Sequence, residues 1–304
     1  MLRPILVAIV LAVLVIPSAS CGERVEIAGP EAPSGAALRV LVGGEGYRDV
    51  LEFVARSGLA AGVTLELVDA PERVNAALVE GSADLAFAQT QPAFLGDRQA
   101  NGYDTLGIAA HVDVAPYALY SSRWADLAPT DDWVNAPLGG DRITGRSLPH
   151  GAEVAVPRTP AGFARALYLL QSAGLLELDR PFGGLTAADL TVTEANIVDS
   201  PRHLRIRALD MSEYAADILA NYDAVVFDPV TATGIGLAPA RDALAVEPGP
   251  GNPYARVLVA PARLAGDPRL TTLAHALEGP AVADYLNRTY AGRFISAQIP
   301  LRPE

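Results

Sequence analysis

Hydrophobic and polar positions alternate between two periodicities in the N-terminal third of the chain. Leu38–Val42 and Ala83–Ala88 are apolar runs, whereas Val63–Val68 alternates apolar with polar residues. Between these segments, Tyr47–Arg56 and Glu72–Glu80 carry apolar residues at helical spacing. Strand-like segments separated by helical ones predict right-handed crossovers onto a mostly parallel sheet.

A second alternating block begins beyond Pro116. Val154–Val156 predicts a short strand, and Pro160–Ala173 predicts an amphipathic helix that ends at Gly174. The remaining candidates are the strands Leu204–Leu209, Ala224–Phe227 and Arg256–Ala260 and the helices Pro268–Leu277 and Val282–Tyr290. We therefore expect an α/β protein in which two lobes surround a cleft.

The order of these elements divides the chain between the two lobes. We expect residues 38–117 and 250–304 to form lobe 1 and residues 118–249 to form lobe 2. Within lobe 2, residues 126–151 form an insertion rich in Pro, Gly and Asp, and this stretch is long for a connection between elements. A lid, a partner contact and a surface loop all remain open for it.

The N-terminus has the pattern of an export signal. Arg3 is followed by the apolar run Ile5–Ile16, by Pro17–Ser20 and then by Cys21, the only cysteine. This run is too short to span a bilayer but suits a secretory signal, so we expect residues 1–20 to be removed. The lone thiol stands where bacterial lipoproteins are cleaved and lipidated, and we expect Cys21 to carry a lipid. Cleavage by an ordinary signal peptidase after Ser20 is the alternative.

Residues 21–37 mix Gly, Pro, Glu and Ala without periodicity, and predict a flexible tether to the membrane. The expected location is the extracytoplasmic face of the cell membrane. The formal net charge of −12, from 23 basic and 35 acidic residues, argues against nucleic acid as a partner. With one cysteine, the fold has no internal disulfide and depends on packing.

Searches for catalytic and cofactor motifs give no convincing set. The glycine-rich turn Gly43–Gly46 has Asp49 where the dinucleotide fingerprint needs glycine, and no Gly-Lys-Ser/Thr follows it. The four histidines are scattered without a metal-binding spacing, and Gly-x-Ser-x-Gly is absent from the sequence. We expect neither a metal nor a cofactor, and an enzyme is the least favoured class.

One strand-to-helix junction carries candidate binding chemistry. Thr159 suits the N-cap of the predicted helix, Pro160 suits its first position, and Arg165 follows on the second turn. Free N–H groups and the helix dipole attract a carboxylate there, and a guanidinium fixes its orientation with two hydrogen bonds. From spacing alone, an exposed arginine beside an ordinary capped helix is the favoured interpretation.

Segments throughout residues 38–300 resemble one family in the same order. Val154–Leu176, VAVPRTPAGFARALYLLQSAGLL, resembles a segment of NlpA/MetQ-type methionine-binding lipoproteins, which are substrate-binding components of ABC importers. The resemblance also covers Val74–Asp84, Pro116–Ser121, Ser200–Ile206 and the stretch from Asp242 to Ala255. It implies a type II periplasmic-binding-protein fold whose hinged cleft binds a small molecule. A membrane permease is the implied protein partner, and we expect a monomer.

The resemblance also assigns roles to two residues. The arginine that matches Arg165 holds the ligand α-carboxylate in the family. The position that matches Asp228 is normally an asparagine that holds the amino-acid head group. Here an aspartate can pair with a ligand ammonium, although a protein salt bridge or a turn cap before Pro229 is an equal alternative.

Departures from the family pattern affect the expected ligand. The family strip FQHKPYL, which grips the methionine side chain, reads AQTQPAF over Ala88–Phe94. The candidate ligand-binding residues are Arg165, Asp228, Arg158, Thr159, Gln89, Thr90, Phe87, Phe94 and Glu45. Arg158-Thr159 replaces an Asn-Asp pair, and Glu45 belongs to the turn at the edge of lobe 1.

These changes predict a binding protein for an amino-acid-like solute, larger or more acidic than methionine. The alternative is an extracellular sensor, or a carrier of another anion such as a sulfonate or phosphonate.

Overall fold

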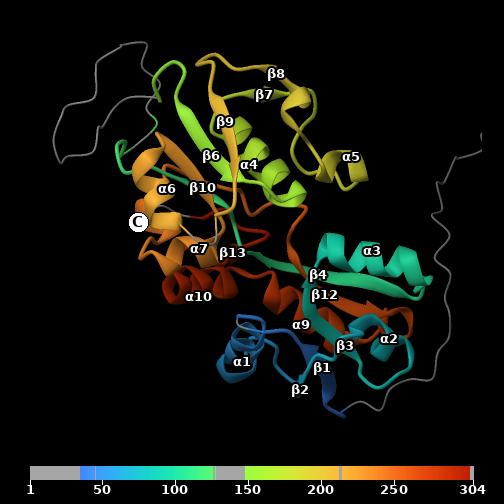
Figure 1. The fold of residues 1–304 in the computed structure, drawn as a ribbon. Coiled ribbons are helices and arrows are strands. Elements are labelled where there is room, and N and C mark those ends of the chain that lie inside the picture. Colours follow the sequence, from blue (N-terminus) through green and yellow to red (C-terminus); the bar gives the residue numbers. More distant parts are fainter. Residues whose placement is uncertain (1–34, 45, 126, 128–147, 212–213, 302–304) are drawn as a thin grey trace, which may run out of the picture.

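The computed structural model describes residues 35–301 except 45, 126, 128–147 and 212–213. Cys21, Glu45 and most of the insertion 126–151 lie outside the described residues. The described chain forms two α/β lobes, one above the other in Figure 1, and each lobe is built around its own sheet. Among the described helices, none is long and apolar enough to cross a membrane.

Lobe 1 contains the first four strands of the chain and its C-terminal part. Its described sheet has the order β13-β4-β12-β3-β1-β2, in which β12 runs antiparallel to both β3 and β4. The strands are β1 (Leu38–Val42), β2 (Leu65–Asp69), β3 (Leu85–Thr90), β4 (Leu106–Val114), β12 (Arg256–Pro261) and β13 (Ile295–Ser296). The helices are α1 (Tyr47–Ser57), α2 (Val74–Val79), α3 (Gln91–Asn101), α9 (Pro268–Leu277) and α10 (Pro280–Tyr290), with a 3₁₀ turn at Ala262–Leu264.

Lobe 2 lies between the two halves of lobe 1 in the sequence. Its described sheet has the order β11-β5-β10-β6-β9, with parallel pairing of β10, β6 and β9. The strands are β5 (Ala118–Tyr120), β6 (Glu153–Pro157), β9 (Arg205–Leu209), β10 (Ala224–Phe227) and β11 (Ala245–Val246), with a separate pair β7 (Glu177–Leu178) and β8 (Ile197–Asp199). The helices are α4 (Pro160–Ser172), α5 (Ala187–Leu190), α6 (Ala215–Asn221), α7 (Pro229–Gly234) and α8 (Pro239–Asp242), with a 3₁₀ turn at Glu194–Asn196.

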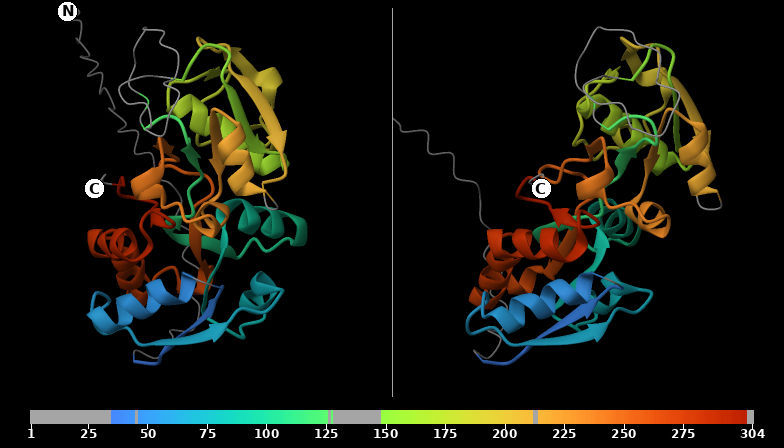
Figure 2. Two further views of the ribbon diagram at one scale, coloured as in Figure 1. Left: turned by 60° about the vertical axis from the view of Figure 1, so that its left-hand side comes forward. Right: turned by 90° about the vertical axis from the view of Figure 1, so that its left-hand side faces the viewer.

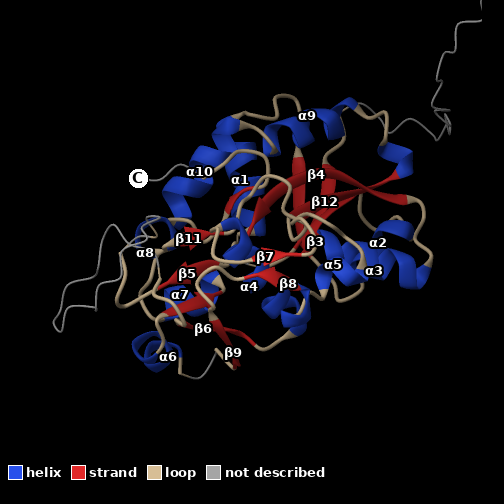
Figure 3. Ribbon diagram, turned by 90° about the horizontal axis from the view of Figure 1, so that it is seen from above, coloured by secondary structure: helices blue, strands red, loops and turns tan. Residues whose placement is uncertain are grey.

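Alternating strand residues supply the two faces of each sheet. In β1, Leu38, Val40 and Val42 face a core that includes residues of α1, α9 and α10, whereas Leu41 belongs to the core under α2 and α3. Figure 3 shows the helices flanking the strands of both sheets. Burial of both sheet faces explains why central strands such as β10 and β12 are almost continuously apolar.

The C-terminal segment of the chain completes lobe 1. Phe53 of α1 stacks on Tyr285 of α10 with ring centroids 4.2 Å apart. Figure 2 shows the C-terminal helices beside the N-terminal helix α1. Contacts between segments so distant in sequence require the chain to return from lobe 2 before lobe 1 is complete.

Two segments connect the lobes, and we call them the first and second crossover. The first crossover, Ala115–Tyr117, joins β4 to β5, and the second, Glu247–Ala255, joins β11 to β12. They are bonded to each other, because the Glu247 N–H donates to the Tyr117 carbonyl at 2.8 Å. This hydrogen bond continues the pairing of β11 with β5 and holds the two crossovers side by side.

The two-lobed α/β fold confirms the fold class expected from the sequence. Each strand and helix anticipated from periodicity is present, with end points shifted by a few residues. The periodicity did not anticipate α3, β4 or the short elements α5–α8. The strip at Ala88–Phe94 runs from the end of β3 into the first turn of α3.

Candidate ligand-binding site

The strand-to-helix junction that begins α4 has the geometry expected from its sequence. β6 ends at Pro157, and the Thr159 side chain accepts a hydrogen bond from the Gly162 N–H at 3.3 Å. Pro160 occupies the first turn, where its missing N–H costs no hydrogen bond. A Cβ atom on Gly162 would lie 2.7 Å from Thr159 Oγ1 and 2.8 Å from Pro157 Cβ. The capped turn therefore requires glycine at position 162.

Arg165, on the second turn of α4, points toward the two crossovers. Its Nε donates to Oε1 of Glu247 at 3.0 Å, and its Nη2 donates to Oε2 of the same carboxylate. Nη2 also donates to the carbonyl oxygen of Ala115 at 2.9 Å. One guanidinium thus connects helix α4 of lobe 2 to both crossovers.

Two tyrosine rings pack against the Arg165 guanidinium. Its central carbon lies 4.1 Å from the ring centroid of Tyr117 and 4.5 Å from that of Tyr254. Burial raises the pKa of Tyr254 to about 12, and raises the pKa of Tyr117. For Arg165 burial is the largest effect and lowers the pKa, but attraction to Glu247 outweighs it and the net shift is upward. The guanidinium is therefore charged at any physiological pH.

One amino group of Arg165 remains available. Nη1 forms no hydrogen bond within the described part of the chain, and it is not among the buried nitrogens that lack a partner. The Arg165 side chain is 12% exposed, whereas that of Glu247 is 0% exposed. The site therefore offers a ligand one charged donor, Nη1 of Arg165. The Glu247 carboxylate that compensates its charge is inaccessible to solvent.

Asp228 follows β10 and caps helix α7. Its Oδ1 accepts from the N–H groups of Val230 at 2.9 Å and Thr231 at 3.0 Å, and its Oδ2 accepts from the Thr231 hydroxyl at 2.6 Å. No cationic side chain among the described residues forms an ion pair with it. Its negative charge raises the pKa of Tyr117, after the larger effects of burial and of Arg165. Asp228 thus lies near the ring that covers Arg165, and the turn cap is realised.

Lobe 1 contains a second arginine between aromatic rings. Arg256 of β12 forms an ion pair with Asp113 of β4, and both side chains are nearly inaccessible to solvent. Its guanidinium carbon lies 4.1 Å from the ring centroids of both Tyr47 and Phe294. Burial raises the pKa of Asp113, and Arg256 opposes that shift. Each of the two aromatic-flanked arginines is thus paired with a buried carboxylate of the protein.

The strip residues of lobe 1 do not form a common surface. Gln89 donates to Oδ1 of the buried Asn75 at 2.7 Å, and Thr90 is the N-cap residue of α3. Phe87 and Phe94 are fully buried, in cores on opposite faces of the sheet. The expectation that Phe87 or Phe94 contacts ligand is not supported, because each side chain is enclosed by the core. Neither is part of the candidate site.

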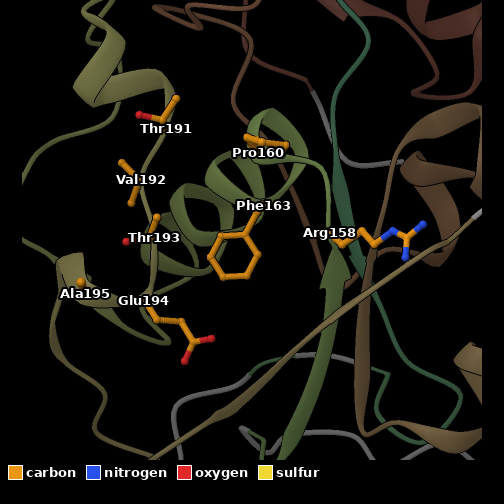
Figure 4. A pocket seen from close by; sticks show the side chains of 8 residues that line it. All are labelled: Arg158, Pro160, Phe163, Thr191, Val192, Thr193, Glu194 and Ala195. Carbon is orange, nitrogen blue, oxygen red and sulfur yellow. The ribbon is translucent and has the colours of Figure 1, made fainter.

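Arg158 lies apart from Arg165. It forms an exposed ion pair with Asp210, 2.9 Å long, beyond the end of β9. It also lines an open pocket of about 490 Å³ beside the start of α4, between Phe163 and the segment Thr191–Ala195 (Figure 4). Arg165 packs against Tyr117 and Asp228 lies near the same ring, whereas Arg158, Gln89 and Thr90 form no bond to Arg165 within the described part of the chain. Groups of His, Cys, Asp and Glu that could hold a metal are absent from the described residues.

Sequence reasoning missed Glu247, Tyr117 and Tyr254, which surround Arg165. A hint was present, because the resemblance from Asp242 to Ala255 includes an acidic position at Glu247 and the tyrosine at 254. It did not indicate that this acid pairs with an arginine 82 positions earlier in the chain.

Comparison with known proteins places the chain in a family. The model of the NlpA lipoprotein family matches residues 142–298, about half of the chain. The chain belongs to the NlpA lipoprotein family. A D-methionine-binding lipoprotein MetQ from Yersinia pestis is 27% identical over 266 residues, which are 86% of this chain and 88% of that protein. The family resemblance read from the sequence is thus confirmed.

Solved structures similar to this NlpA-family chain agree with that assignment. A periplasmic substrate-binding protein of an ABC transporter from Coxiella burnetii is 28% identical with a TM-score of 0.54, covering 85% of this chain and 99% of its own. A nutrient-binding protein from Burkholderia cenocepacia, bound to methionine, is 26% identical with a TM-score of 0.53, covering 86% and 99%. The relatives named here are substrate-binding proteins of ABC transporters or bind methionine.

Proposed function

We propose that this chain is a lipid-anchored, extracytoplasmic substrate-binding protein of an ABC importer, and that it binds an amino-acid-like zwitterion. The observation that carries the proposal is the Arg165 guanidinium, which keeps one accessible donor at the junction of α4 with both crossovers. The ligand carboxylate binds Nη1 of Arg165 beside the first turn of α4, whose N–H groups add a positive potential. The ligand ammonium pairs with Asp228, which lacks a cationic partner among the described residues.

The position of Arg165 suits ligand capture by movement of the two lobes. It contacts both crossovers, which any relative rotation of the lobes must bend. A ligand that binds the closed arrangement better shifts the population toward that arrangement. We propose that the closed form then docks on a membrane permease.

Calorimetric titration of the ligand-free protein with the L-amino acids tests the proposed ligand class. We expect at least one to bind, and at a hundred times its dissociation constant to stabilise the fold by about 2.7 kcal/mol. The double variant R165Q/E247Q removes Nη1 without leaving a buried charge, and we expect it to lose this binding. The variant R207Q, which removes an exposed ion pair with Glu153 in the same lobe, serves as the control. Absence of binding to every amino acid would refute the proposed ligand class.

The proposed anchor at Cys21 has a separate test. Metabolic labelling with palmitate in a bacterial host should mark the wild-type chain and not the C21S variant. Equal recovery of both chains in the aqueous phase of a detergent partition would refute lipid anchoring, without bearing on ligand binding.

A further inference from the structure

We propose that Glu247 determines the charge specificity of the binding site: by balancing Arg165 it makes the site accept one carboxylate and exclude dianions. The inference rests on the proposed role of Arg165 as the carboxylate anchor. The sequence predicted a solute larger or more acidic than methionine. The role of Glu247 predicts instead a solute that carries a single negative group.

The contacts of Glu247 show that its position is fixed. Its carboxylate receives two guanidinium hydrogen bonds from Arg165 and a third, at 3.1 Å, from the N–H of Tyr117. Its own N–H is bonded to the Tyr117 carbonyl, and its side chain is 0% exposed. Such a carboxylate cannot swing away when a ligand arrives, so the compensating charge stays beside Arg165.

The balance of charges at the site follows from these contacts. Arg165 contributes one positive charge, and Glu247 and Asp228 contribute two negative ones. A zwitterion adds one charge of each sign and places its ammonium at Asp228. A second carboxylate on the ligand meets no uncompensated cation among these described arginines, because Arg256 is paired with Asp113 and Arg158 with Asp210. In a partly buried site such an unmatched charge is strongly disfavoured.

The geometry also assigns Glu247 a positioning role. It occupies Nε and one Nη2 hydrogen, and the Ala115 carbonyl shares Nη2, so Nη1 is the donor left for ligand. Contacts with the rings of Tyr117 and Tyr254 restrict the movement of the guanidinium. Ligand carboxylates are therefore received from one direction only.

Titration of the E247Q variant with succinate tests the proposal. Glutamine keeps the shape and an acceptor but removes the charge, so Arg165 becomes uncompensated. We expect the succinate affinity to rise tenfold or more over that of the wild type, and to fall back in R165Q/E247Q. The variant D267N is the control, because it removes the charge of a carboxylate that pairs with another arginine, Arg269, outside the candidate site on lobe 1 at the start of α9.

Any of three results would overturn the proposal: no gain of succinate affinity in E247Q, an equal gain in D267N, or a gain that is retained in R165Q/E247Q. If E247Q does not fold in buffer, the yield of refolded protein is measured against succinate concentration, with neutral succinamide for comparison. Succinate must raise that yield and succinamide must not, or the proposal fails.

The two proposals can fail separately. A wild-type protein that binds no amino acid while E247Q gains succinate binding contradicts only the proposed ligand class. An amino acid that binds through Arg165, with no gain of succinate binding in E247Q, contradicts only the role of Glu247 in charge specificity.

Discussion

Arg165 of helix α4 and Glu247 of the second crossover form a buried ion pair between elements 82 residues apart in the sequence. Their side chains are 12% and 0% exposed, and the Ala115 carbonyl and two tyrosine rings complete the enclosure. In such an environment neither charge is tolerated without the other, because desolvation is offset only by their mutual attraction. The pair therefore links the integrity of the crossovers to the helix that begins the candidate site.

Removing only the arginine should destabilise the protein strongly. In R165M the Glu247 carboxylate stays buried without its cation, and we expect a loss of about 3–5 kcal/mol in the free energy of unfolding. The double variant R165M/E247L replaces both charges with apolar side chains, and should recover most of that loss. Urea denaturation of the wild type, both single variants and the double variant measures the coupling. Additive effects of the two substitutions would show that the pair is not coupled.

Asp228 combines a structural and a proposed binding role, and two substitutions separate them. Asparagine also caps helices well, so D228N should keep the free energy of unfolding within about 0.5 kcal/mol of the wild type, whereas D228A should lose about 1–2 kcal/mol. We expect D228N to bind an amino-acid ligand at least tenfold more weakly, because the charge-assisted bond to the ammonium is lost.

Denaturation and calorimetry of the two Asp228 variants measure both quantities, with D267N as a control. Asp267 caps α9 by accepting from the Arg269 N–H at 2.8 Å, outside the candidate site. Unchanged ligand affinity in D228N would leave Asp228 as a cap only.

Much of the fold could be predicted from the sequence, because periodicity and capping are local. Thr159 and Pro160 identified the start of α4, and the apolar run Ala224–Phe227 identified β10. Partners distant in sequence could not be predicted. Nothing around Glu247 indicates that its carboxylate faces Arg165.

The aromatic residues Phe87 and Phe94 were misjudged for a related physical reason. An aromatic residue suits a ligand surface and a core equally well in sequence. For Phe94 the fold decides between ligand surface and core, because helix α3, which follows β3, places its side chain in the core on one face of the sheet.

Gly162 should be one of the least replaceable residues of α4. In G162A the new methyl group would meet Pro157 Cβ at 2.8 Å, and the rigid proline cannot yield. We expect a loss of roughly 1–3 kcal/mol in the free energy of unfolding, despite the better helix propensity of alanine. Gly96 in α3 has open space around the same position, so G96A should stabilise by about 1 kcal/mol. Thermal denaturation of both variants checks the contrast, and equal effects would contradict the packing argument.

The pH dependence of stability should carry a contribution from His111 of β4. Its Nε2 lies 3.2 Å from Oε1 of Gln91, and its backbone N–H donates to Oε1 of Glu278 at 2.9 Å. Burial lowers the pKa of the imidazole, and the nearby charge of Glu278 offsets only part of that shift. As the pH falls below about 6.5, the unfolded chain therefore binds a proton before the folded protein does.

Proton binding by the unfolded state lowers the free energy of unfolding. His111 makes no such contribution at neutral pH, whereas acidification from pH 7.5 to 5.5 destabilises the protein through this residue. The variant H111Q keeps an amide that can bond Gln91 but cannot titrate. We expect the wild type to lose more stability than H111Q over this range, since the carboxylates and the other histidines contribute equally to both proteins. Parallel urea titrations at several pH values measure the difference. A larger loss in H111Q would mean that the folded protein binds the proton more tightly, as it would if attraction to Glu278 outweighed burial.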